Sequence, residues 1–175
     1  MLKHLLISLV CCLFALAGCS RSEAPDQAPD QAPEREPGQA AAEGNDSSLA
    51  DLNAGVRALA RPDATVDYVA AEMEGTIMAR TKSQALMHYD GYRVTLTTPG
   101  DRVTQIKFDL VEAKPSIRQL TELFGEPEEG RKGMRYEYES VVTGSTIVIL
   151  AVPVSTPATE STLVRQIIVA GARKR

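Results

Sequence analysis

The dipeptide Asp90-Gly91 stands between two stretches of alternating apolar and polar residues, and this pattern constrains the fold more than any other. Asp-Gly is among the strongest short signals for a two-residue hairpin turn. Alternation with a period of two is typical of strands that bury one face. The turn therefore predicts three facing pairs on one side of a hairpin: Tyr89 with Tyr92, Met87 with Val94, and Ala85 with Leu96.

More strand-like segments extend this hairpin into an antiparallel meander. Residues 103–110 alternate, with Ile106, Phe108 and Leu110 directed inward. The same reasoning predicts strands over 134–140, 146–152 and 163–170. The run 146–152 is almost entirely apolar, which indicates either a strand covered on both faces or a central strand. Residues 75–82 fit a short strand or a loop.

Three segments have helical spacing instead. Leu49, Leu52, Val56 and Leu59 predict a helix over 49–61, which Pro62 ends. A second helix is expected over 63–73. A third is expected over 114–125, where Ser116 and Gln119 form a capping box and Gly125 ends the helix.

Together these segments indicate an α+β fold with helices packed on one face of an antiparallel sheet. Their order suggests tandem helix-plus-three-strand units, preceded by one extra helix. The stretches Val103-Thr-Gln-Ile106 and Val164-Arg-Gln-Ile167 support an internal duplication, because they match in pattern and in three of four residues.

The N-terminus predicts export. Lys3 precedes an apolar run over residues 5–16 that is too short to span a bilayer, so residues 1–18 read as a signal peptide. Its end, Leu16-Ala17-Gly18-Cys19, resembles the bacterial lipoprotein signal. The resemblance implies recognition of Leu16, Ala17 and Gly18 by a signal peptidase and attachment of lipid, including palmitate, to Cys19. Ser20 in the next position is similar to outer-membrane sorting signals. The alternative is an ordinary secretory signal with a chance cysteine.

Residues 19–48 predict a lipidated cysteine followed by a disordered tether rich in Pro, Ala and acidic residues. Residues 49–175 then form a single α+β domain. This domain has equal numbers of acidic and basic residues, so the negative net charge of the chain arises in the tether, where acidic residues outnumber Arg21 and Arg35. A balanced domain without a basic stripe argues against nucleic acid as a partner.

The inventory of catalytic residues after the signal is small. His88 is the single histidine there, and a zinc site needs three or four ligands drawn mainly from His and Cys. Glu137 and Glu139 share one strand face beside Arg135, and a solvated face is the better interpretation. We therefore expect no catalytic residues, no metal and no cofactor. The candidate docking face consists of the outward residues His88, Arg93, Lys107, Asp109, Arg135, Glu137 and Glu139.

One stretch carries a family resemblance. The segment from Lys114 to Pro127 ends in Gly125-Glu126-Pro127, and the strand Arg135-Tyr-Glu-Tyr138 follows it. This arrangement resembles the SmpA/OmlA-like outer-membrane lipoproteins and the β-lactamase-inhibitor-protein-like fold. The resemblance implies a non-enzymatic module of a Gram-negative envelope that binds other envelope proteins, with a role in outer-membrane assembly or maintenance. The alternatives are a periplasmic enzyme or inhibitor acting on cell-wall material, and a passive spacer.

Overall fold

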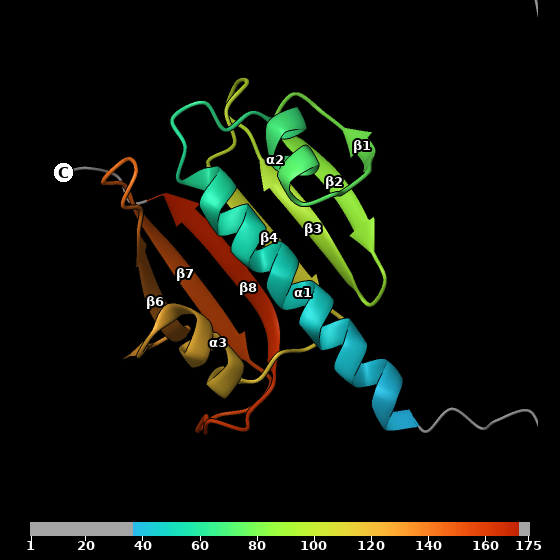
Figure 1. The fold of residues 1–175 in the computed structure, drawn as a ribbon, viewed down its shortest axis with the longest axis vertical. Coiled ribbons are helices and arrows are strands. Elements are labelled where there is room, and N and C mark those ends of the chain that lie inside the picture. The colour runs from blue at the N-terminus through green and yellow to red at the C-terminus, as the bar shows by residue number, and fades with distance from the viewer. Residues whose placement is uncertain (1–36, 172–175) are drawn as a thin grey trace, which may run out of the picture. The chain divides into compact units, whose positions relative to one another are not determined.

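The computed structural model describes residues 37–171, and their side chains from Ser47 onward (Figure 1). The signal peptide, Cys19 and the tether up to residue 36 lie outside the described residues. The fold is α+β, with three helices and one antiparallel sheet of eight strands. The helices are α1 (Pro37–Leu59), α2 (Val66–Glu72) and α3 (Ile117–Phe124). The strands are β1 (Ile77–Arg80), β2 (Gln84–Tyr89), β3 (Tyr92–Thr97), β4 (Gln105–Leu110), β5 (Glu128–Gly130), β6 (Gly133–Glu139), β7 (Thr146–Pro153) and β8 (Val164–Gly171).

The sheet has the order β1-β2-β3-β4-β8-β7-β6-β5. Strands β1 to β4 follow α2 in the sequence, and strands β5 to β8 follow α3. Each half therefore has four strands, and the predicted count of three per half is wrong. The additional strands, β1 and β5, are the short edges of the sheet. The sequence of β5, Glu-Glu-Gly, has no apolar residue, so no alternation predicts a strand there. All three of its residues are exposed.

The predicted hairpin is confirmed residue by residue. Tyr89 pairs with Tyr92, Met87 with Val94, and Ala85 with Leu96. Gly91 takes a φ of 80°, which the turn needs and glycine adopts without steric cost. The rings of Tyr89 and Tyr92 stack with their centroids 4.7 Å apart.

The starts of α2 and α3 follow from their caps. Thr65 Oγ1 accepts a hydrogen bond from the backbone N–H of Tyr68, and Ser116 forms the predicted capping box with Gln119. These bonds satisfy donors that the first turn of a helix leaves without partners. Gly125 ends α3 with a φ of 85°.

The predicted start of the first helix at residue 49 is wrong, because α1 begins at Pro37. Residues 37–48, assigned to the tether, are helical. The stretch Gln39-Ala-Ala-Ala-Glu43 consists of strong helix formers, although it has no large apolar side chain. The prediction relied on apolar spacing, which marks only the part of a helix that packs on a core.

Burial alternates along the strands and defines two faces of the sheet. In β4 and β7, every second side chain is buried and the others are partly exposed. The buried face includes Phe108, Ile149 and Ile167. Gly55 of α1 lies against this face, because a Cβ there would be 3.3 Å from Ile106 Cδ1 and 3.5 Å from Phe108 Cζ. We call the opposite side the partly exposed face.

The backbone at position 133 requires a glycine. It has a φ of 141°, and a Cβ on it would lie 2.1 Å from the Ala151 carbonyl oxygen. Gly133→Ala should therefore lower the free energy of unfolding by about 1–3 kcal/mol, measured by urea denaturation.

Two other glycines provide controls. Gly100 has a φ of 87° with nothing near its missing Cβ, so Gly100→Ala should cost only backbone strain, ~1 kcal/mol. Gly171→Ala, with neither feature, should be close to neutral. Equal losses at all three positions would contradict the steric explanation.

Candidate functional site

The structure places all seven candidate docking residues on strands whose registers bring them to the partly exposed face. His88 pairs with Arg93, and Arg93 pairs with Asp109 across β2, β3 and β4. Lys107 lies in the neighbouring row of β4. Arg135, Glu137 and Glu139 lie on β6, on the far side of β8 and β7. The seven residues therefore form two groups with two strands between them.

In the first group, Asp109 is the centre of the polar contacts. Lys107 Nζ lies 2.8 Å from Asp109 Oδ2, and Gln166 Nε2 donates a hydrogen bond of 2.8 Å to Asp109 Oδ1. Partial burial raises the pKa of Asp109. The hydrogen bonds from Lys107 and Gln166, with the charges of Lys107 and Arg93, outweigh it and hold the pKa below its ordinary value. Asp109 is therefore an ionised, positioned acceptor that links β4 to β8.

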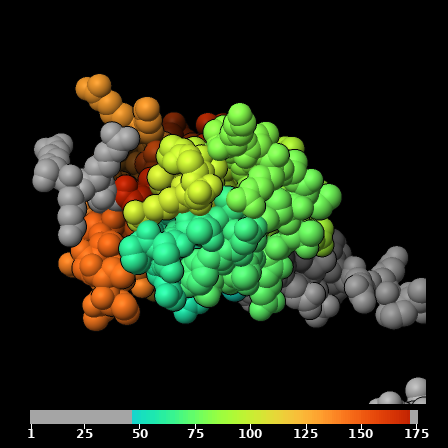
Figure 2. Space-filling model, turned by 90° about the horizontal axis from the view of Figure 1, so that it is seen from above, coloured from blue at the N-terminus to red at the C-terminus, as the bar shows by residue number. Residues whose placement is uncertain are grey.

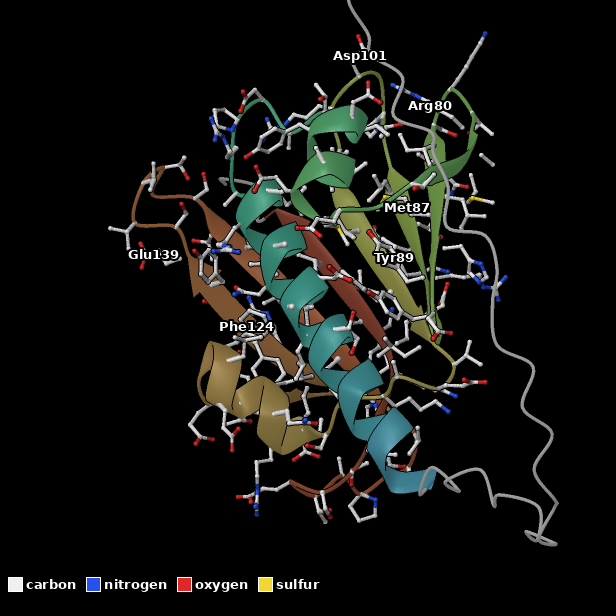
Figure 3. The ribbon with its side chains drawn as sticks, turned by 45° about the vertical axis from the view of Figure 1, so that its right-hand side comes forward. Arg80, Met87, Tyr89, Asp101, Phe124 and Glu139 are labelled. Carbon is white, nitrogen blue, oxygen red and sulfur yellow. The ribbon has the colours of Figure 1, made fainter. Side chains whose placement is uncertain are left out.

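In the second group, Arg135 is the centre. Its Nη1 lies 2.9 Å from Glu128 Oε2 on β5, and its Nη2 pairs with Glu137. Glu139 pairs in register with Thr146 at the end of β6, and Figure 3 shows it at that margin of the sheet. The ion pair with Arg135 occupies Glu137, so Glu137 and Glu139 do not form a free carboxylate pair.

Between the two groups lies an apolar surface that sequence reasoning missed. It consists of outward side chains of two neighbouring inner strands, β7 and β8, which we call the apolar centre: Val148, Leu150 and Val152 on β7, and Ile168 and Ala170 on β8. All are partly exposed. Leu150 pairs in register with Ile168, so the two strands form one continuous patch. The nearly unbroken apolar run of β7 was the signal, and it predicted either coverage on both faces or a central strand. The strand lies inside the sheet, between β8 and β6, and its outward side chains are partly exposed.

A second polar cluster lies on the buried face, around α1. The Tyr92 hydroxyl donates a hydrogen bond to Asp51, and the Tyr89 hydroxyl donates one of 3.0 Å to the Met73 carbonyl oxygen. Figure 3 shows Met87 and Tyr89 beside each other on β2. Burial raises the pKa of Tyr92, and the bond to Asp51 raises it further. Burial also raises the pKa of Asp51, against the lowering effect of the Tyr92 hydroxyl. These contacts join α1 and the segment after α2 to the first hairpin.

The β6–β7 loop carries an exposed apolar pair away from the apolar centre. Val141 is 99% exposed and Val142 is 93% exposed. The loop is held in place, because Thr143 Oγ1 donates a hydrogen bond of 3.0 Å to the Ala60 carbonyl oxygen. In Figure 2, the orange side chains of this part of the chain extend beyond the body of the domain. These valines offer a matched control for the apolar centre.

Neither a metal site nor a membrane-spanning helix is found in the part of the chain that the structure describes. No three His, Cys, Asp or Glu residues come together there to bind a metal ion. No helix there is both long and apolar enough to cross a membrane. The predicted lipid site at Cys19 and the recognition residues Leu16, Ala17 and Gly18 lie outside the described residues.

Comparison with known proteins adds no relative. No family model matches the chain, and neither a curated protein nor a solved structure matches it.

Asp51 and Asp109 predict opposite pH dependences of stability. The folded pKa of Asp51 is raised, so its contribution is fully present below the unfolded pKa of about 3.9 and is lost as the pH rises through the folded value. The folded pKa of Asp109 is lowered, so its contribution is present above about pH 4 and is lost as the pH falls through the folded value. Thermal unfolding midpoints of the wild type, Asp51→Asn and Asp109→Asn between pH 2.5 and 7 check both signs.

Asp51→Asn should remove a decline in stability with rising pH, and Asp109→Asn should remove a loss at acid pH. If both substitutions changed the dependence of stability on pH in the same direction, either the burial of Asp51 or the polar contacts of Asp109 would be wrong.

Proposed function

We propose that this chain is a lipid-anchored, non-enzymatic binding module that presents the partly exposed face to another protein of a Gram-negative envelope. The observation that carries the proposal is the apolar centre on β7 and β8 with charged groups on both sides. An apolar centre with a polar rim is typical of protein interfaces. The charged groups would orient the partner, and burial of the apolar centre would supply affinity.

The proposal includes the inference that all three helices cover the buried face and leave the other face free. Contacts of each helical segment support it. The Tyr136 hydroxyl on β6 donates a hydrogen bond to the Ile117 carbonyl oxygen of α3. Asp51 of α1 accepts from Tyr92, and Met73 at the end of α2 accepts from Tyr89. The view in Figure 1, with α1 drawn across β4 and β8, agrees with this arrangement.

We further infer that the two halves are a tandem duplication of a helix with four strands. Equivalent hydrogen bonds support it. The Val103 amide donates to the Ala64 carbonyl oxygen (2.7 Å), and the Val164 amide donates to the Pro115 carbonyl oxygen (2.8 Å). In each half, the residue that caps the helix also forms a bridge beside the last strand, Thr65 with Arg102 and Ser116 with Leu163.

The anchor belongs to the proposal through Leu16-Ala17-Gly18-Cys19 and Ser20. A multiply acylated cysteine would hold the chain on the outer membrane without a spanning helix. Residues 19–36 can span at most ~60 Å when fully extended, so the domain would work within that distance of the membrane on the periplasmic side. The resemblance of residues 114–138 to the SmpA/OmlA-like lipoproteins supports a role in outer-membrane assembly or maintenance.

Photocrosslinking in cells tests the face. A photoreactive phenylalanine analogue in place of Lys107 should trap a discrete partner. The same analogue in place of Val141 or Val142, which are exposed on the β6–β7 loop, should not. Leu150→Ser should reduce the Lys107 crosslink about fivefold, which corresponds to ~1 kcal/mol of binding free energy. Val141→Ser, on the exposed β6–β7 loop, should leave it unchanged. Equal crosslinking at all three positions, or none at any, would count against this face as the docking surface.

A labelling experiment tests the lipid anchor independently of the docking face. Radiolabelled palmitate should enter the wild-type chain and be lost on Cys19→Ala. A wild-type chain that forms the crosslink but incorporates no palmitate would reject the anchor and retain the binding module.

A further inference from the structure

A groove opens at the end of the partly exposed face where β6, β7 and β8 meet the β5–β6 turn. Its volume is about 460 Å³, within the range of small-molecule sites. The groove does not include Asp109 or Lys107, but it shares Gln166 with their group and three residues, Leu150, Val152 and Ile168, with the apolar centre. Its floor and its rim differ in chemistry.

The floor of the groove is apolar. Leu150 and Val152 of β7 and Ile168 of β8 line it, and the pairing of Leu150 with Ile168 makes their side chains neighbours. Each of these side chains is only partly covered. An aliphatic chain laid on this floor would remove apolar surface from water at a gain of roughly 25 cal/mol per Å².

The rim of the groove is basic. Arg131 and Lys132 form the two-residue turn between β5 and β6, and Arg165 lies on β8. Glu129 is the one acidic residue among those that line the groove. Within the described residues, none of the three cations has an ion-pair partner, whereas Arg135 nearby pairs with both Glu128 and Glu137.

The strand end that carries the basic turn lies close to the backbone of β7. The space beside Gly133 is so small that a Cβ would lie 2.1 Å from the Ala151 carbonyl oxygen. Gly133 pairs with Gly130 across the turn, so the two glycines bring Arg131 and Lys132 close to the end of β7. The position of the cations beside the apolar floor is therefore a feature of the backbone.

We propose that this groove binds an anionic amphiphile, a molecule that joins a carboxylate or phosphate headgroup to an aliphatic chain. The headgroup lies between Arg131, Lys132 and Arg165, where charge-assisted hydrogen bonds replace contacts with water. The chain lies on Leu150, Val152 and Ile168. This site goes beyond the proposed function, because the domain takes this ligand without a protein partner.

Calorimetric titration tests the site on the unlipidated chain from residue 19 onward with Cys19→Ser, which contains every described residue. The probes are decyl phosphate and decanoate, below their micelle concentrations. Decyltrimethylammonium tests the sign of the charge, and inorganic phosphate tests the need for the chain. We expect at least one anionic probe to bind about tenfold or more tightly than the cationic probe and than inorganic phosphate.

Variants locate the binding. The double substitution of Lys132→Gln and Arg165→Gln should weaken the anionic probe about tenfold, and Lys82→Gln, at an exposed lysine outside the groove, should not. Binding of decyl phosphate alone identifies a phospholipid-type headgroup, and binding of decanoate as well extends the site to fatty acids. Either result supports the proposal. Equal binding of the cationic amphiphile, no binding of either anionic probe, or an equal effect of Lys82→Gln would overturn it.

Discussion

The pairing of β4 with β8 is the interaction on which the rest of the structure depends. It joins two four-stranded halves that would otherwise each have an additional open edge. Ile106 pairs with Val169 and Phe108 with Ile167, and all four side chains are at most 1% exposed. Burial of such side chains contributes about 1.5–3 kcal/mol each. An exposed ion pair such as Arg118 with Glu160 contributes at most ~1 kcal/mol. Apolar packing is therefore the larger contribution to the junction, and the hydrogen bond from Gln166 to Asp109 adds to it on the other face.

The same register determines what the partly exposed face contains. Since side chains alternate between the two faces, the pairing that buries Phe108 and Ile167 also places Lys107 and Ile168 next to each other on the other face. A slip of one residue would bury Lys107 and Asp109 and expose the core. Core packing thus fixes the positions of both the proposed docking surface and the proposed amphiphile groove. Neither site depends on a flexible loop to assemble its apolar part.

Sequence reasoning succeeded where the determining contacts are local. The Asp90-Gly91 turn predicted the register of the first hairpin through its three inward pairs, and Ser116 with Gln119 predicted the cap of α3. It failed where no local signal exists. The β5 residues are all exposed, and the first turns of α1 have helix propensity without apolar spacing. The pairing of β4 with β8 joins residues far apart in the chain, so alternation could not reveal it. For the same reason, the seven docking residues could be assigned to outward positions, but the apolar centre between them could not.

The continuity of the sheet can be measured directly, because the described domain has no cysteine. In the chain from residue 19 onward with Cys19→Ser, the double variant Lys107→Cys with Ile168→Cys places two thiols at partner positions of β4 and β8. The account predicts that mild oxidation forms this disulfide in the folded protein. It predicts none for Thr95→Cys with Ile168→Cys, since Thr95 lies one strand further away, on β3. A disulfide in the second variant and not in the first would contradict the joined sheet and, with it, the composition of the partly exposed face.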